Sequence, residues 1–126
     1  MLVPLSAVAL EPRPSGRKKM AIVTTEWRYG SHAWHMGERF LVGYPLRGKW
    51  HTPELEVVSA YVDQFPEKDL SRGRAKEFGF TIYPTVAEAL RCGGKSLAVD
   101  AVLVIGEHGK YPKTPFEQTK YPRYEF

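Results

Sequence analysis

Apolar residues gather in four short runs separated by longer stretches of mixed character. The runs are 20–24, 55–62, 80–83 and 99–105. Short runs rich in β-branched residues are typical of strands buried on both faces of a parallel sheet. Because they alternate with segments of helical character, they predict an α/β fold, a Rossmann-like doubly wound parallel sheet. With about four strands and three helices, we expect this sheet to be incomplete.

The segments between the runs carry the signals that begin and end helices. Helices are predicted at 31–41, 70–78 and 85–91. Ser31 and Asp69 are placed to cap the first two, and Gly79 supplies a left-handed residue after the second. Thr85 and Glu88 form a capping box, in which each side chain bonds the free amide of the other residue.

These elements divide the chain into three parts. Residues 1–18 contain three prolines and end in basic residues, which predicts a flexible leader. Residues 19–109 form the Rossmann-like domain, with 43–53 as an inserted loop rich in glycine, proline and aromatic residues. Residues 110–126 show no periodic apolar face, so we expect an irregular tail that is truncated before a catalytic domain.

Composition excludes several classes of protein. The 126 residues fit one domain, and the net charge of +4 comes from basic residues scattered among 14 acidic ones, which does not predict a nucleic-acid surface. The single cysteine, Cys92, excludes an internal disulfide and a thiolate zinc site. No run approaches the roughly 20 apolar residues of a membrane span, so no membrane partner is expected. The apolar N-terminus lacks the basic start of a signal peptide, which favours a cytoplasmic location and leaves export open if the true start lies upstream.

Three segments follow Asp63, the end of the second predicted strand, in an order that resembles that of a known family. They read Arg-Ala-Lys-Glu-Phe-Gly-Phe at 74–80, Tyr-Pro-Thr-Val-Ala-Glu-Ala-Leu at 83–90 and Val-Asp-Ala-Val-Leu-Val-Ile at 99–105. Together they resemble the cofactor domain of the Gfo/Idh/MocA oxidoreductases, the family of glucose-fructose oxidoreductase and inositol dehydrogenase, over residues 19–109. The resemblance implies a domain that binds NAD or NADP, in an enzyme that moves a hydride to or from a sugar, cyclitol or related polyol.

The loop after the first strand departs from that family. Where the family has a glycine fingerprint, residues 24–31 read Thr-Thr-Glu-Trp-Arg-Tyr-Gly-Ser, and Gly30 alone remains. The glycines let the backbone approach a pyrophosphate, so we expect the bulky residues at 27–29 to crowd that approach. Arg28 can compensate by pairing with a phosphate, and the helix start at Ser31 offers amides and a favourable dipole.

Asp63 occupies the place of the acidic residue with which the family bonds the ribose hydroxyls, and the inserted loop explains its distance from the first strand. A carboxylate there favours NAD over NADP because it repels a 2′-phosphate. A turn-forming Asp63 without a ligand is the other interpretation. The predicted cofactor-binding residues are Thr24, Thr25, Glu26, Arg28, Gly30, Ser31, Asp63, Gly106 and His108.

The chain also lacks the segment that carries catalysis in the family. No Glu-Lys-Pro follows the last predicted strand, and we expect the C-terminal sheet domain that supplies most substrate contacts in the family to be missing from this chain. No catalytic residue is therefore assigned, and we expect the chain to be catalytically incomplete alone. Two hypotheses remain: the NAD-type nucleotide-binding domain of an oxidoreductase, or a non-catalytic Rossmann-like module that has lost dinucleotide binding. The expected partners are a dinucleotide, a sugar-like molecule, and either a second copy or the missing domain.

Several titratable residues are expected at one edge of the sheet, because the loops after parallel strands gather there. They are Glu26, His32, His35, Asp63, Glu107 and His108. His32 and His35 share a helical face without a fixed carboxylate partner, so a metal site is a weaker hypothesis than packing or capping. His108 lies in a glycine-flanked turn, where it has either a working role or none.

Aromatic residues concentrate in the first half and in the tail. For the tryptophans at 27, 34 and 50, core packing is favoured over a platform that stacks a base. The tail aromatics are expected to be exposed, which implies a missing domain or a partner. They are Tyr111, Phe116, Tyr121, Tyr124 and Phe126.

Overall fold

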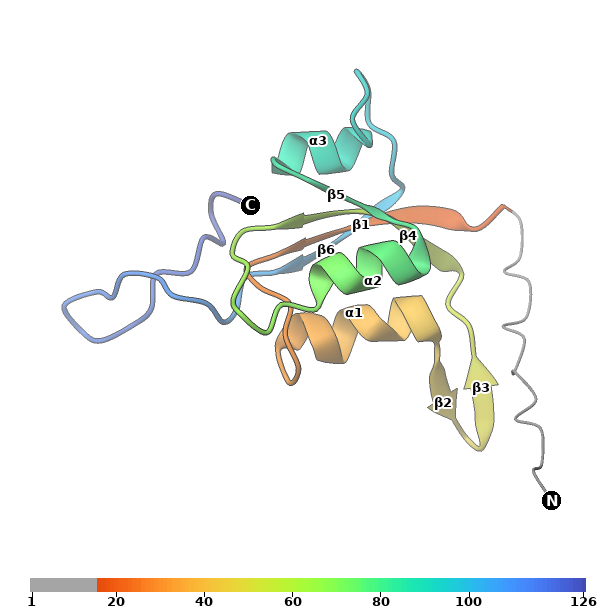
Figure 1. Cartoon of the computed structure of the whole chain (residues 1–126), viewed down its shortest axis with the longest axis horizontal. Helices are drawn as coiled ribbons and strands as arrows, with labels where there is room; N and C mark the ends of the chain where they lie inside the picture. Colours follow the sequence, from red (N-terminus) through yellow and green to blue (C-terminus); the bar gives the residue numbers. More distant parts are fainter. Residues whose placement is uncertain (1–15) are drawn as a thin grey trace.

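The computed structural model describes residues 16–126 and has a four-stranded parallel sheet at its centre (Figure 1). Its strands are β1 (Lys18–Thr24), β4 (Leu55–Val62), β5 (Thr81–Tyr83) and β6 (Ala101–Ile105). They lie in the order β5-β4-β1-β6, and every pairing is parallel. This is the order of the first four strands of a Rossmann sheet, so the predicted α/β class is confirmed.

Helices cover both faces of the sheet. They are α1 (His32–Val42), α2 (Ser71–Phe78) and α3 (Val86–Arg91). In Figure 1, α1 and α2 lie on one face and α3 on the other. The change of face occurs because the chain passes from β5 to β6 across β4 and β1, while each crossover remains right-handed. Within residues 16–126, no helix is long and apolar enough to cross a membrane.

The helix ends largely follow the predicted capping chemistry. Ser31 Oγ accepts from the Trp34 amide at 3.2 Å, and Gly79 adopts the left-handed conformation after α2. Asp69 accepts from the amides of residues 71 and 72, although α2 begins at Ser71 rather than at residue 70. One of the two bonds of the predicted capping box is present: the Glu88 amide donates to the Thr85 hydroxyl. The second differs, because the Glu88 carboxylate accepts from the Thr85 hydroxyl instead of from the Thr85 amide.

The inserted segment forms a hairpin, so the prediction of a plain loop was wrong. β2 (Tyr44–Leu46) pairs antiparallel with β3 (Lys49–His51). Arg47 and Gly48 both have positive φ, at 51° and 74°, which is the backbone of a two-residue turn that matches strand twist. Trp50 is 63% exposed, and its indole nitrogen donates to the Val42 carbonyl. Core packing was therefore the wrong expectation for this tryptophan.

Trp27 anchors the core beneath α1. Its side chain is fully buried and stacks on Phe80 with ring centroids 5.9 Å apart. Gly37 of α1 passes directly over the indole, and a Cβ at this position would lie 3.1 Å from it. Trp27 therefore packs in the core, as favoured from the sequence, and its side chain is not exposed at the surface of the loop. Of the bulky residues at 27–29, Tyr29 is the exposed one.

Residues 110–126 run irregularly past the carboxyl ends of the strands, at the opposite end of the sheet from the β2–β3 hairpin (Figure 1). Phe116 and Tyr124 are exposed as predicted, whereas Tyr111, Tyr121 and Phe126 are half-buried. The predicted leader, 1–18, ended too late, because β1 already includes Lys18, and its residues 1–15 lie outside the described residues.

We predict that Gly37→Val lowers the free energy of unfolding by about 1–3 kcal/mol, because the added carbons meet the Trp27 indole in a packed core. Gly73→Val is the matched control, since no heavy atom lies within 4 Å of a Cβ built at Gly73 of α2, and we expect a change of about 0.5 kcal/mol or less. Urea unfolding monitored by circular dichroism compares the two. Equal effects would contradict this account of the core.

Candidate functional site

The loops after β1, β4 and β6 meet at the carboxyl edge of the sheet. The chain order reverses between β1 and β6, which is the point where open α/β sheets bind ligands. Two groups of side chains lie along this edge. We call the first the switch-point cluster (Glu26, Arg28, His32 and His108). The second is the carboxylate pocket, which consists of Asp63 and the other residues that line the hollow beside it.

Thr24, the last residue of β1, and Thr25, which follows it, hold these loops together. Both are fully buried. The Asp63 amide donates to the Thr24 carbonyl at 3.0 Å, and the Gln64 amide to the Thr25 carbonyl at 2.8 Å. On the other side, the Thr25 amide donates to the last residue of β6 at 3.2 Å, and its hydroxyl donates to the Glu107 carbonyl. The threonines therefore fix the position of the site through bonds within the protein.

The switch-point cluster joins the β1 loop, the start of α1 and the turn after β6. Glu26 is 6% exposed and accepts from Arg28 Nε at 2.6 Å. Arg28 Nη2 lies 3.5 Å from His108 Nδ1. The ring centroids of His108 and His32 are 4.6 Å apart. His35 packs edge-on against Trp34. Four of the predicted residues thus come together, with Arg28 ion-paired to Glu26.

Burial lowers the pKa of His108 below its ordinary value, and the neighbouring His32 and Arg28 lower it further. The imidazole is therefore neutral at neutral pH and able to accept or donate a proton. His108 has a positive φ of 66°, in the turn where the sequence placed it. Within residues 16–126, no group of three or more His, Cys, Asp or Glu side chains is arranged to hold a metal ion.

Gly30 and Ser31 shape the turn that leads into α1. Gly30 is exposed and left-handed, with φ of 76°. Ser31 is fully buried, and its hydroxyl accepts from the Arg28 amide as well as from the first turn of α1, each at 3.2 Å. Part of the donor capacity at this helix start is thus satisfied internally.

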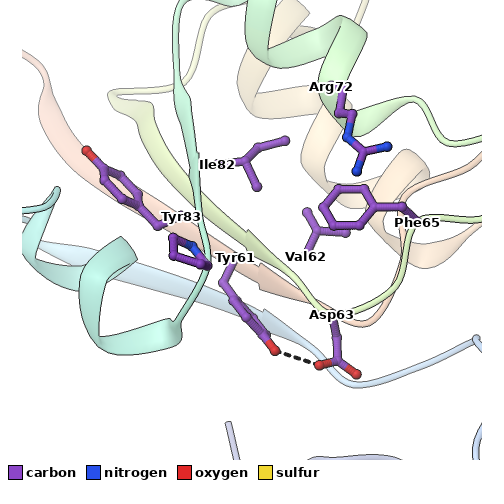
Figure 2. Close-up of a pocket in the computed structure, with 8 residues that line it drawn as sticks. Tyr61, Val62, Asp63, Phe65, Arg72, Ile82 and Tyr83 are labelled. Atoms are coloured by element: carbon purple, nitrogen blue, oxygen red, sulfur yellow. Dashed lines mark hydrogen bonds between the residues drawn. The ribbon is translucent and has the colours of Figure 1, made fainter.

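The carboxylate pocket is a hollow of about 470 Å³ between the ends of β4 and β5. Figure 2 shows the Arg72 guanidinium over the Phe65 ring, 3.9 Å from its centroid, with Asp63 below them at the end of β4. Its lining residues are Tyr61, Val62, Asp63, Phe65, Arg72, Ile82, Tyr83 and Pro84. Aromatic and apolar walls with one cation and one anion suit a planar, polar ligand.

Both oxygens of Asp63 accept hydrogen bonds from phenols. Tyr61 donates to Oδ1 at 2.5 Å, as Figure 2 shows, and Tyr111 donates to Oδ2 at 2.6 Å. Burial, followed by the bond to Asp63, raises the pKa of Tyr61 to about 12 and also raises that of Tyr111. Both phenols therefore remain protonated donors at neutral pH.

Residues 106–111 form a strap that runs from the end of β6 to Asp63. The Gln64 side chain binds the backbone of the strap at two points. Its Nε2 donates to the Lys110 carbonyl, and its Oε1 accepts from the Lys110 amide, each at 2.9 Å. At the start of the strap, Arg123 donates to the Gly106 carbonyl at 3.0 Å and pairs with Glu107. The strap therefore links the switch-point cluster to the carboxylate pocket.

Sequence reasoning missed the partners of Asp63. Tyr61 lies two residues before Asp63 near the end of β4, and strand alternation places residues at this spacing on one face, so a signal existed. Tyr111 lies 48 residues from Asp63, and no local pattern connects them. Gln64, Phe65 and Arg72 likewise gain their roles through the fold.

Comparisons with protein-family models, with curated proteins and with solved structures gave no match. The geometry of this edge is therefore the basis for assigning a function.

We predict that stability declines as the pH falls below about 6.5 in part because of His108. Its pKa is lowered in the folded state, so the unfolded chain takes up this proton first and is favoured as the pH falls. His108→Asn, which tolerates the positive φ, should flatten the decline in melting temperature between about pH 7.5 and 5. His35→Asn is the control. A decline as steep in His108→Asn as in the unmodified chain would refute this assignment.

Proposed function

We propose that the chain is the nucleotide-binding domain of an oxidoreductase of the Gfo/Idh/MocA kind, and that it binds a dinucleotide of the NAD type along the carboxyl edge of its sheet. The observation that carries this proposal is the Asp63 carboxylate at the end of β4, beside a pocket, in a sheet of order β5-β4-β1-β6. In such sheets the strand next to the first one ends in the carboxylate that bonds a ribose diol.

The carboxylate pocket fits the adenosine half of the dinucleotide. Asp63 provides the acceptor for ribose hydroxyls, and the stacked pair of Phe65 and Arg72 offers a surface for the base. Tyr83 lies across the pocket at the end of β5. A negative charge at Asp63 disfavours a 2′-phosphate, which supports NAD over NADP.

The loop between β1 and α1 is the less typical part of the proposed site. Its Glu26 carboxylate opposes a phosphate, but the ion pair with Arg28 at 2.6 Å offsets that charge. The α1 N-terminus adds a favourable dipole. Without the glycine fingerprint, we expect the diphosphate to lie over the loop rather than against its backbone.

The switch-point cluster lies on the side of β1 where the reacting half of a dinucleotide extends in a Rossmann domain. The His108 and His32 imidazoles lie together there, burial keeps His108 neutral, and a sugar or polyol bound beside them would meet groups able to accept or donate a proton. When bound, the nicotinamide supplies hydride chemistry, while these residues orient a hydroxyl or hold its proton. No residue of this chain is assigned as catalytic.

A second candidate function is a non-catalytic interaction module. Within the described residues, β6 pairs on one side alone, and Val102 and Val104 on this strand are 42% and 49% exposed. An apolar strand with a free edge is able to pair with another chain. The occupied oxygens of Asp63 favour the same candidate, in which nucleotide binding has been lost.

We predict saturable binding of NADH, measured by quenching of tryptophan fluorescence and by energy transfer to the nicotinamide. Asp63→Ala should weaken the affinity about tenfold or more because a charged acceptor of the ribose is lost, and NADPH should bind the unmodified chain more weakly than NADH. Glu67→Ala removes an exposed carboxylate from the same loop and should leave the affinity unchanged. Equal affinities for Asp63→Ala and Glu67→Ala would contradict the ribose role of Asp63.

A further inference from the structure

The strap ends on the carboxylate that the proposed function gives to the ribose. We propose that Tyr111 closes this site: its phenol stands where a ribose hydroxyl would bind Asp63, so that a nucleotide must displace Tyr111 and release the strap. This inference rests on the proposed nucleotide binding and adds the residue that controls it.

The two phenols reproduce the hydrogen bonds of a vicinal diol. A diol bound to a carboxylate donates one O–H to each oxygen, and here Tyr61 and Tyr111 donate to Oδ1 and Oδ2 at 2.5 and 2.6 Å. The site thus has the acceptor geometry of a ribose site, and each oxygen already accepts one hydrogen bond. A diol that binds in this same two-oxygen mode takes the place of an existing charge-assisted hydrogen bond.

Tyr111 is the partner that is able to leave. Tyr61 is part of β4, which is hydrogen-bonded on both sides, so its hydroxyl stays beside Asp63. Tyr111 belongs to an irregular segment and reaches Asp63 through a turn in which His108 and Gly109 both have positive φ, of 66° and 100°. A Cβ at Gly109 would lie 2.7 Å from the Tyr111 ring, so this close return depends on glycine.

A second anchor of the strap lies next to the bond between Asp63 and Tyr111. The two bonds from Gln64 to the Lys110 backbone are adjacent to the bond between Asp63 and Tyr111. A ligand that removes Tyr111 from Asp63 therefore weakens the hold on Lys110 as well. Because linkage is reciprocal, whatever loosens the strap also favours the ligand.

The first test compares NADH affinity among conservative tyrosine variants. Tyr111→Phe keeps the ring and removes the competing hydroxyl, so we expect the dissociation constant to fall about tenfold. Tyr124→Phe removes a hydroxyl from a residue of the same segment that is 98% exposed, and should leave the constant unchanged. If the unmodified chain binds NADH and Tyr111→Phe binds it equally well, the strap proposal is wrong while nucleotide binding stands.

The second test follows the strap itself in the unmodified chain. The Lys110 amide donates to Gln64, so it should exchange with deuterium slowly in the free protein and at least about fivefold faster when NADH is saturating. Unchanged or slower exchange with NADH bound would overturn the displacement. Absence of NADH binding by the unmodified chain and by a folded Tyr111→Phe variant would instead overturn the proposed function, and the strap proposal with it.

Discussion

The position of β1 between two parallel neighbours determines the rest of the site. β1 pairs with β4 along one side and β6 along the other, and its side chains from Met20 to Thr24 are buried. The ladder continues past the end of the strand through the carbonyls of Thr24 and Thr25. Asp63, which follows β4, and His108, which follows β6, are thereby carried to the same edge. A change in the pairing register of β1 would shift the loop after β4 and the loop after β6 relative to each other.

At that edge, most of the charge is balanced within the protein. Glu26 forms an ion pair with Arg28 and Glu107 one with Arg123, while the oxygens of Asp63 accept hydrogen bonds from two neutral phenols. The buried Glu26 requires its partner most, because a buried carboxylate without one destabilises the fold. A ligand that takes the position of one of these partners competes with an interaction already made. The affinity of the proposed nucleotide site therefore depends on which internal partner leaves most easily.

The strands and helices could be predicted from the sequence because each carries a local signal. Apolar runs marked the strands, and Ser31, Gly79 and Thr85 marked helix ends through bonds to residues one turn away. The hairpin at 44–51 was missed because its turn, Arg47-Gly48, places a non-glycine residue at positive φ. Core packing of Trp27 was expected, but Gly37, which makes room for its indole, lies in a different element, and no local pattern connects the two.

The candidate site was predictable in its location but not in its internal contacts. The edge of the sheet and the acidic residue after β4 followed from strand order, whereas the bonds of Asp63 to Tyr111 and of Gln64 to Lys110 join segments 46 to 48 residues apart. Such contacts arise from the path of an irregular segment, for which no periodic pattern exists.

The most direct test of a ribose site at Asp63 is a ¹⁵N–¹H correlation spectrum recorded during titration with adenosine 5′-monophosphate. This ligand contains the adenine base, the ribose and one phosphate, and it lacks the nicotinamide half of the dinucleotide. The account predicts saturable shifts in the amides of residues 61–65, Arg72 and the strap. Shifts confined to the β2–β3 hairpin, or a spectrum that does not change, would contradict it.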